Sequence, residues 1–363
     1  MTAKKTLEGP PSVPTEAGGP PGGAGTDAPT APSGDAPEVG GAASRLASLL
    51  GPLGFLRNLP GPLAGLIVLF IAASFMSEHF LTANNLLNIV GQVSHLGIMA
   101  VGAALVIIIG GIDLSVGSTL ALSIMTSSWL YSTIGLPFGW SVAAGLAVGV
   151  GVGVLNGFLV TRGRIQPFVA TLATMSAAAG LALYITNGVP ITGFPDWFLQ
   201  ITRVRFYGVS IQAIVLLAVF LWVGLWLRYR PNGRALYAIG GNEEVARLSG
   251  IPVRRLKIRV YATAGLLASI GGLIVMSRLN SAQPTAGEAD LLNVIAVVVI
   301  GGASLAGGRG TMLGTLTGLF IVGVLNNIMN LMNVSPNLQP VVIGAVIIAV
   351  VLTDRKTAAG QSG

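Results

Sequence analysis

The chain has 363 residues, of which 52% are hydrophobic and only 9% are charged, and it contains no cysteine. Ordinary soluble domains carry about 25% charged residues, so this composition predicts an all-α polytopic membrane protein. The net charge of +7 does not indicate a nucleic-acid partner, because the basic residues lie in short loops beside apolar runs. The lack of cysteine excludes disulfides and thiolate metal sites.

The N-terminal region differs in composition from the rest. Residues 1–42 are dense in Pro, Gly, Thr and Ala, and we expect a disordered tail there. Residues 43–58, ASRLASLLGPLGFLRN, place leucines at helical spacing between two arginines, which is typical of a short helix at the membrane interface; a leader into the first span is the alternative. We expect a transmembrane domain over 59–354 and a cytoplasmic tail over 355–363.

Apolar runs separated by Pro, Gly and charged residues predict ten spans, since about 20 helical residues cross a hydrocarbon core of ~30 Å. The predicted spans are 61–77, 86–109, 114–134, 138–160, 165–186, 208–228, 259–279, 290–306, 310–330 and 339–353. Most Lys and Arg residues in the loops then fall on one side, above all in the cluster from Arg228 to Arg259. The positive-inside rule therefore places both chain ends in the cytoplasm.

Asp113 lies in the stretch GGIDLSVGS, and it is the only acid between Glu78 and Asp196. Our first interpretation is a helix cap, in which the carboxylate accepts from the N–H groups of Ser115 or Val116 at the start of the third span. The second is a gate or pathway residue, because an acid within the membrane is costly and usually functional. Both interpretations stay open at this point.

Small residues dominate several spans, as in AAGLAVGVGVGVLNG at 143–157, and they predict close packing of helices. The segments IIIGGIDLSVGSTLAL (107–122) and VVIGGASLAGGRGTMLGTLTGL (298–319) also resemble each other. Each is an apolar run, a Gly pair, a short break and a new span. This echo indicates two related halves, as in many transporters.

The longest hydrophilic segment within the membrane region is the loop 229–258. Its centre, NEEVARLSGI at 242–251, has an Asn cap, two acids in the first turn and a Gly stop, which predicts a short surface helix parallel to the membrane. Such a helix would present itself to a partner in the cytoplasm. The alternative is a solvated basic loop without a partner.

The segments GGIDLSVGS, AIGGNEEVARLSGI and VVVIGGASLAGGRGTMLGTLTGLFIVGVLNN, in this order, resemble the signature segments of permease subunits of bacterial ABC importers of the ribose, xylose and galactose type. The similarity runs from about residue 60 to 353. It implies a ten-helix permease of the bacterial plasma membrane. It also implies as partners a second permease copy, two cytoplasmic ATP-binding subunits and an extracytoplasmic sugar-binding protein.

The resemblance further implies that the short helix is the coupling helix that docks into the ATPase. Its residues are Asn242, Glu243, Glu244, Val245, Ala246, Arg247 and Gly250. We expect the small Ala246 and the stop at Gly250 to let this helix fit its socket. Two positions depart from the family pattern: Val245 replaces a small residue, and in GEADLLN the acid before the eighth span is displaced, with Leu291 in its place.

The chain lacks the motifs of an enzyme or an ion pump. It has no Gly-Lys dipeptide and hence no phosphate-binding loop, so ATP and Mg²⁺ would be used by the partner ATPase, and we expect no cofactor or metal on this chain. Its two His residues do not supply a catalytic set. It has no chain of intramembrane acids for ion coupling, and neither His95 nor Asp113 has an evident charged partner.

A neutral sugar needs polar partners without strong charge, and the sequence offers a set of candidates for the pathway. They are Gln92, Ser94, His95, Asp113, Ser115, Asn156, Thr171, Thr174 and Asn293. For each, hydrogen bonding between helices is the alternative role. We therefore predict the permease of an ATP-driven sugar importer, with a nucleoside or another small polar metabolite as the alternative solute and a stand-alone ion-coupled transporter as the alternative class.

Overall fold

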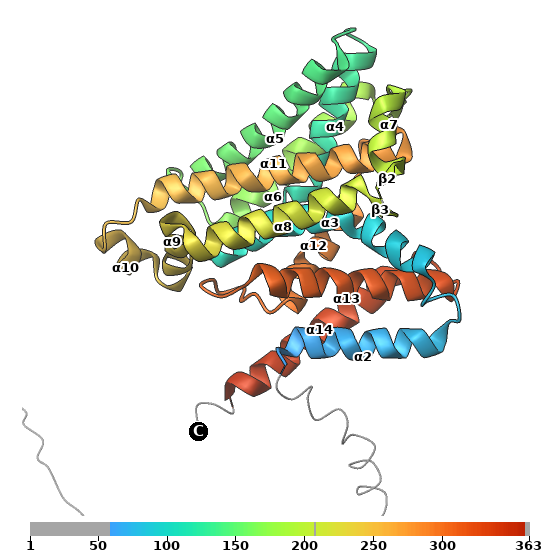
Figure 1. Ribbon diagram of the computed structural model, residues 1–363. Coiled ribbons are helices and arrows are strands. Elements are labelled where there is room, and N and C mark those ends of the chain that lie inside the picture. The colour runs from blue at the N-terminus through green and yellow to red at the C-terminus, as the bar shows by residue number, and fades with distance from the viewer. Residues whose placement is uncertain (1–58, 207, 360–363) are drawn as a thin grey trace, which may run out of the picture. The chain divides into compact units, whose positions relative to one another are not determined.

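The computed structural model describes residues 59–206 and 208–359. The predicted tail (1–42) and interfacial helix (43–58) lie outside these residues. In the described part the chain is helical, apart from two short antiparallel ladders (Figure 1). Strand β1 (Ile191–Thr192) pairs with β4 (Ser281–Ala282), and β2 (Arg205–Phe206) pairs with β3 (Val209–Ser210).

A helix lies at the position of every predicted span. These helices are α2 (Gly61–Met76), α3 (Ala83–Ile108), α4 (Val116–Ser132), α5 (Phe138–Thr161), α6 (Pro167–Thr186), α8 (Ile211–Tyr229), α11 (Val253–Leu279), α12 (Glu288–Ile300), α13 (Met312–Leu331) and α14 (Gln339–Ala359). Within the described residues, α3, α5, α6, α8, α11 and α13 are long and apolar enough to cross a membrane by themselves. Helix α4 has 17 residues and α12 has 13.

Three helices lie outside the predicted spans. Helix α7 (Asp196–Arg203) precedes α8, and α9 (Pro231–Gly241) and α10 (Glu243–Leu248) connect α8 to α11. In Figure 1, α9 and α10 lie at one end of α8 and α11, and α7 lies at the other end. Our prediction of a single short helix in the loop 229–258 therefore missed α9, whose first residue is a proline, a favourable residue at that helical position.

The last six residues of the predicted span 290–306 are not helical. Helix α12 ends at Ile300, and Gly302 has a φ of +83°, a conformation that ends a helix and that favours glycine. Residues 301–311 form an irregular connection before α13. Because Gly301 and Gly302 follow an apolar run directly, the apolar pattern alone did not locate this end.

Helix α3 lies at the centre of the packing. It contacts α8, α11, α12 and α13. In its most apolar stretch of 18 residues, 94% is buried inside the protein. Helices α5 and α11 approach closely through glycines at every fourth position in 149–157, which therefore share one face. A Cβ on Gly149 would lie 2.7 Å from the carbonyl oxygen of Gly265, and one on Gly153 would lie 2.2 Å from that of Tyr261. The predicted packing through small residues is confirmed here.

Candidate functional site

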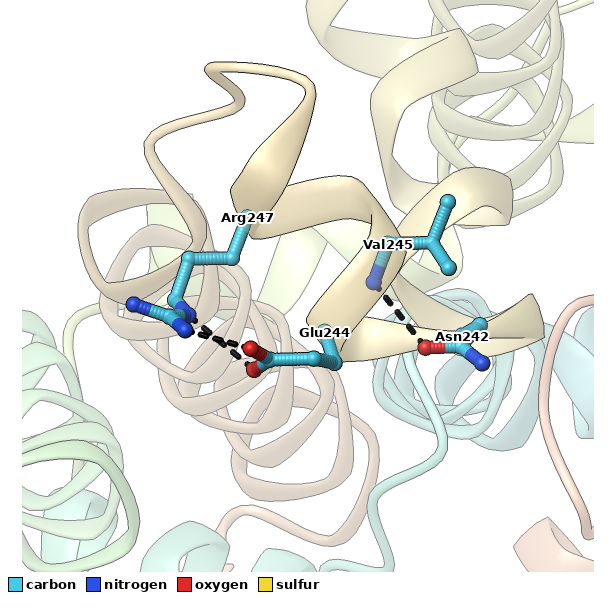
Figure 2. A network of polar contacts seen from close by, with 4 residues as sticks. All are labelled: Asn242, Glu244, Val245 and Arg247. Atoms are coloured by element: carbon cyan, nitrogen blue, oxygen red, sulfur yellow. Dashed lines mark hydrogen bonds and ion pairs between the residues drawn. The ribbon is translucent and has the colours of Figure 1, made fainter.

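Helix α10 is short but has a defined start and end. The side-chain oxygen of Asn242 accepts a hydrogen bond of 3.0 Å from the Val245 N–H (Figure 2), as expected of an N-cap. At the other end Gly250 has a φ of +82°, and the N–H of Ile251 donates to the carbonyl of Ala246 at 3.1 Å. This glycine-terminated turn fixes the length of α10.

Two ion pairs involve residues of α10, one within the helix and one to α11. Glu244 and Arg247 pair within the helix, one turn apart (Figure 2), and the guanidinium lowers the pKa of the Glu244 carboxyl below its ordinary value. Glu243 pairs with Lys257 of α11 at 2.5 Å. The second pair links the first residue of α10 to α11.

The two faces of α10 differ in exposure. Ala246 is only 3% exposed and packs against the hydrophobic core, whereas Val245 and Leu248 are 57% and 74% exposed. Ala246 therefore lies on the inner face of the helix, and its predicted part in docking stays a prediction. The outer face instead presents two apolar side chains, which are three residues apart on one side of the helix.

The end of α9 meets the two irregular segments of the internal echo, one between α3 and α4 and one between α12 and α13. We name this site the glycine junction. It consists of Gly110, Gly240, Gly241, Gly307 and Gly308. A Cβ on Gly240 would lie 1.8 Å from the carbonyl oxygen of Ile108, and one on Gly307 would lie 2.8 Å from the Cα of Gly110. The N–H of Gly308 donates to the Ile108 carbonyl at 2.9 Å. Three segments that are distant in sequence thus touch through backbone atoms.

Asp113 heads a chain of buried hydrogen bonds that joins α4, α5 and α6. Its Oδ1 accepts from the N–H of Ser115 at 2.9 Å and from the Ser115 hydroxyl at 2.6 Å. The side-chain amide of Asn156 donates to the Ser115 hydroxyl at 2.8 Å, and the Thr174 hydroxyl donates to Asn156 Oδ1 at 2.6 Å. Because Ser115 is the N-cap residue of α4, Asp113 lies two residues before the cap and holds the turn that leads into the helix.

The other pathway candidates separate into different settings. Thr171 donates to the carbonyl of Ile112, beside Asp113, at 3.1 Å. Ser94 and Asn293 donate to carbonyls in their own helices, which favours a structural role for both. The Gln92 side chain is exposed.

His95 has a charged partner that the sequence did not predict. Its Nε2 lies 3.5 Å from Oδ2 of Asp290, in the first turn of α12, and the prediction that His95 lacks such a partner is wrong. The sequence signal was the acid in GEADLLN, one position before Leu291. The helix geometry turns Asp290 toward α3, whereas no ion pair of Asp113 occurs among residues 59–206 and 208–359.

The first turn of α4 and the residue before α12 also touch through glycines. A Cβ on Gly117 would lie 2.2 Å from the carbonyl oxygen of Gly287, which has a φ of +86°. Helices α4 and α12 therefore begin beside each other. Exposed N–H groups at such helix starts are positive dipole ends, which transporters place near their substrate sites.

Comparison with known proteins assigns the family. Residues 85–351 match the model described as a branched-chain amino acid transport system/permease component. The chain belongs to this permease family. The permease is 46% identical to the ribose import permease protein RbsC of Bacillus subtilis (strain 168) over 308 residues, which cover 84% of this chain and 95% of the relative.

Two further relatives agree. The permease is 46% identical to RbsC of Escherichia coli (strain K12) over 300 residues, which cover 81% of this chain and 92% of the relative. It is 37% identical to the L-arabinose transport system permease protein AraH of the same strain over 296 residues, covering 81% and 90%. A search of the solved structures found no match. The resemblance to ABC importer permeases that the sequence motifs indicated is confirmed, and the permease is a transport subunit.

Proposed function

We propose that this permease is the membrane-spanning subunit of an ATP-driven importer that translocates a small sugar delivered by an extracytoplasmic binding protein. Two of its relatives are named as a ribose import permease and as an L-arabinose transport system permease. These names support a monosaccharide as the solute. In this proposal the protein lies in the bacterial plasma membrane with ten spans and with both chain ends in the cytoplasm. The basic residues around α9 and α10 support this orientation.

The energy would come from partner subunits. Because the sequence has no phosphate-binding loop of the Walker type, ATP and Mg²⁺ are assigned to two cytoplasmic ATP-binding subunits. A second permease copy, identical or related, would complete the membrane part of the transporter. The resemblance to ABC importer permeases supports both assignments.

Helix α10 would dock into the ATP-binding subunit. The observation that carries this assignment is the exposed apolar pair, Val245 and Leu248, on a helix that is capped at both ends and joined to α11 by the Glu243–Lys257 pair. Exposed apolar side chains on a rigid support are typical of the centre of an interface. A solvated basic loop would not need them.

The glycine junction provides a route from the docking helix to the membrane. Helix α10 packs on α9, whose last two residues belong to the junction and touch the breaks after α3 and α12. A displacement of α10 would therefore reach the starts of α4 and α13. Alternating access needs such a movement of packed segments between two arrangements.

The test is Leu248→Asp in the full transporter, with ATP-binding subunits, binding protein and D-ribose in proteoliposomes. Removal of an apolar anchor from an interface centre costs about 2 kcal/mol or more, which corresponds to a loss of affinity of roughly thirtyfold or more. We expect weaker copurification of the ATP-binding subunits and loss of the ATP hydrolysis that loaded binding protein stimulates. Basal hydrolysis by the ATP-binding subunits alone should not change.

The matched control is Leu338→Asp, which makes the same chemical change at another exposed leucine, in the loop before α14. This variant should copurify the ATP-binding subunits as the wild type does. Normal copurification and normal stimulation in Leu248→Asp as well would show that docking occurs elsewhere on the permease.

A further inference from the structure

Three ionisable side chains lie close together where α3, α11 and α12 pack. His95 Nε2 is 3.5 Å from Asp290 Oδ2, and Arg278, in the last turn of α11, donates to the backbone carbonyl of Gln92 at 3.2 Å. The side chains of His95 and Asp290 are 11% and 22% exposed, whereas Arg278 and Gln92 are exposed. Ionisable groups within membrane helices are expensive, and their usual role is functional.

His95 has an unused hydrogen-bonding atom. Its Nδ1 is buried and has no hydrogen-bond partner within the protein. The whole residue is only 8% exposed. When the Nε2 hydrogen points to Asp290, Nδ1 of a neutral imidazole is an acceptor. Buried polar atoms in native proteins nearly always have partners, so this atom is suited to a donor that arrives from outside the chain.

A side-chain pair that only linked α3 to α12 would not need an Nδ1 atom without a hydrogen-bond partner. The same helix α3 has such a tie for comparison: Asn85 and Asn327 of α13 exchange two hydrogen bonds, of 2.9 and 2.8 Å, and both side chains are satisfied. The His95–Asp290 pair differs because it leaves Nδ1 without a donor and because a fifth of the Asp290 side chain is exposed.

We propose that His95 and Asp290 bind hydroxyl groups of the transported sugar inside the membrane part of the permease. Hydroxyl groups donate, and both the Asp290 carboxylate and His95 Nδ1 accept. Hydrogen bonds to a carboxylate are among the stronger ones, so the pair distinguishes a polyhydroxylated solute from one that lacks a hydroxyl. The inference rests on the proposed sugar import. Because Nδ1 is covered here, the sugar reaches it in a conformation in which α3 and α12 have separated.

The test uses Asp290→Asn in the complete transporter and measures ribose moved per ATP hydrolysed, with 2-deoxyribose as a competing sugar. We expect a fall in ribose per ATP of roughly tenfold, since one charge-assisted hydrogen bond corresponds to about this factor. We also expect a smaller preference for ribose over 2-deoxyribose.

A charge swap separates binding from a structural tie. In the double variant His95→Asp with Asp290→His, a pair between α3 and α12 can form again, but the groups that face the sugar are exchanged. We expect normal assembly and thermal stability with transport still low. Restored transport and restored sugar preference would overturn the proposal, as would normal ribose per ATP in Asp290→Asn.

The matched control is Asn327→Ala, which removes the satisfied tie between α3 and α13. We expect this variant to have a lower thermal unfolding midpoint and an unchanged preference between the two sugars. A changed preference would mean that the loss of any contact between α3 and a neighbouring helix has this effect, and it would overturn the proposal. If the wild-type transporter moves neither ribose nor arabinose, the proposed function itself fails and the inference fails with it.

Discussion

Asp113 supports the start of α4 through a single oxygen, which accepts both hydrogen bonds from Ser115. In Asp113→Asn the amide oxygen accepts the same two bonds, so we expect normal assembly and ribose transport within about twofold of the wild type. Asp113→Leu leaves the buried N–H and hydroxyl of Ser115 without this acceptor, at a cost of about 1–3 kcal/mol for each unpaired group. We expect a lower thermal unfolding midpoint and less assembled transporter, measured by size-exclusion chromatography after heating.

The opposite result would favour the gate interpretation of Asp113. An Asn variant that assembles normally but does not transport would show that the charge itself is needed. The contact of Asp113 with Ser115 was predictable because the two residues are neighbours in sequence. The continuation to Asn156 and Thr174, and the pairing of His95 with Asp290, were not predictable, because helices that are apolar on all sides do not reveal which face turns toward which neighbour.

Gly250 determines how α10 ends. Its φ is +82°, and a Cβ there would have no heavy atom within 4 Å, so only backbone conformation limits substitution. Asn tolerates this conformation, whereas a β-branched residue is strained by roughly 1–2 kcal/mol. We expect Gly250→Asn to keep stimulated ATP hydrolysis and Gly250→Val to lose most of it, while the membrane part stays folded in both. Equal activity of the two variants would show that this turn does not position α10.

Most helices were predictable because continuous apolar runs of sufficient length fold as helix in a membrane. The short helix α10 was predictable from Asn242, the acids that follow it and Gly250. Helix α9 and the early end of α12 were not, because α9 has no long apolar run and because Gly301 and Gly302 are small residues that occur within spans as well as at their ends. The inward direction of Ala246 depends on α9 and α11, which the local pattern does not contain.

At the scale of the whole molecule, the glycine junction joins the end of α9, on which α10 packs, to the irregular segments that follow α3 and α12. Gly240 and Gly241 are adjacent, but a Cβ on Gly240 would lie 1.8 Å from the Ile108 carbonyl, whereas one on Gly241 would have no heavy atom within 4 Å. We therefore expect Gly240→Ala to force the segments apart, to lower the thermal unfolding midpoint and to reduce ribose moved per ATP. Gly241→Ala is the control and should behave as the wild type. Indistinguishable variants would contradict the proposed route.

The arrangement of these segments could not be derived from the sequence echo alone. The echo identified two similar breaks, one within 107–122 and one within 298–319, but not that Gly110 of the first touches Gly307 of the second with the end of α9 against both. Glycines carry no side-chain chemistry from which a partner could be inferred. In a protein with so many of them, contact through backbone atoms becomes visible only in the folded chain.

The exposed pair on α10 also has a consequence for a permease that has no partner yet. Val245 and Leu248 are exposed, and in the proposed function they stay uncovered until an ATP-binding subunit binds. Uncovered apolar side chains on a surface favour unspecific association. A cell that makes the permease in excess would therefore display a recognition mark on every surplus copy. Chaperones and membrane proteases that bind exposed apolar segments could then remove the surplus, so that one six-residue helix would help to keep the subunits in balanced numbers.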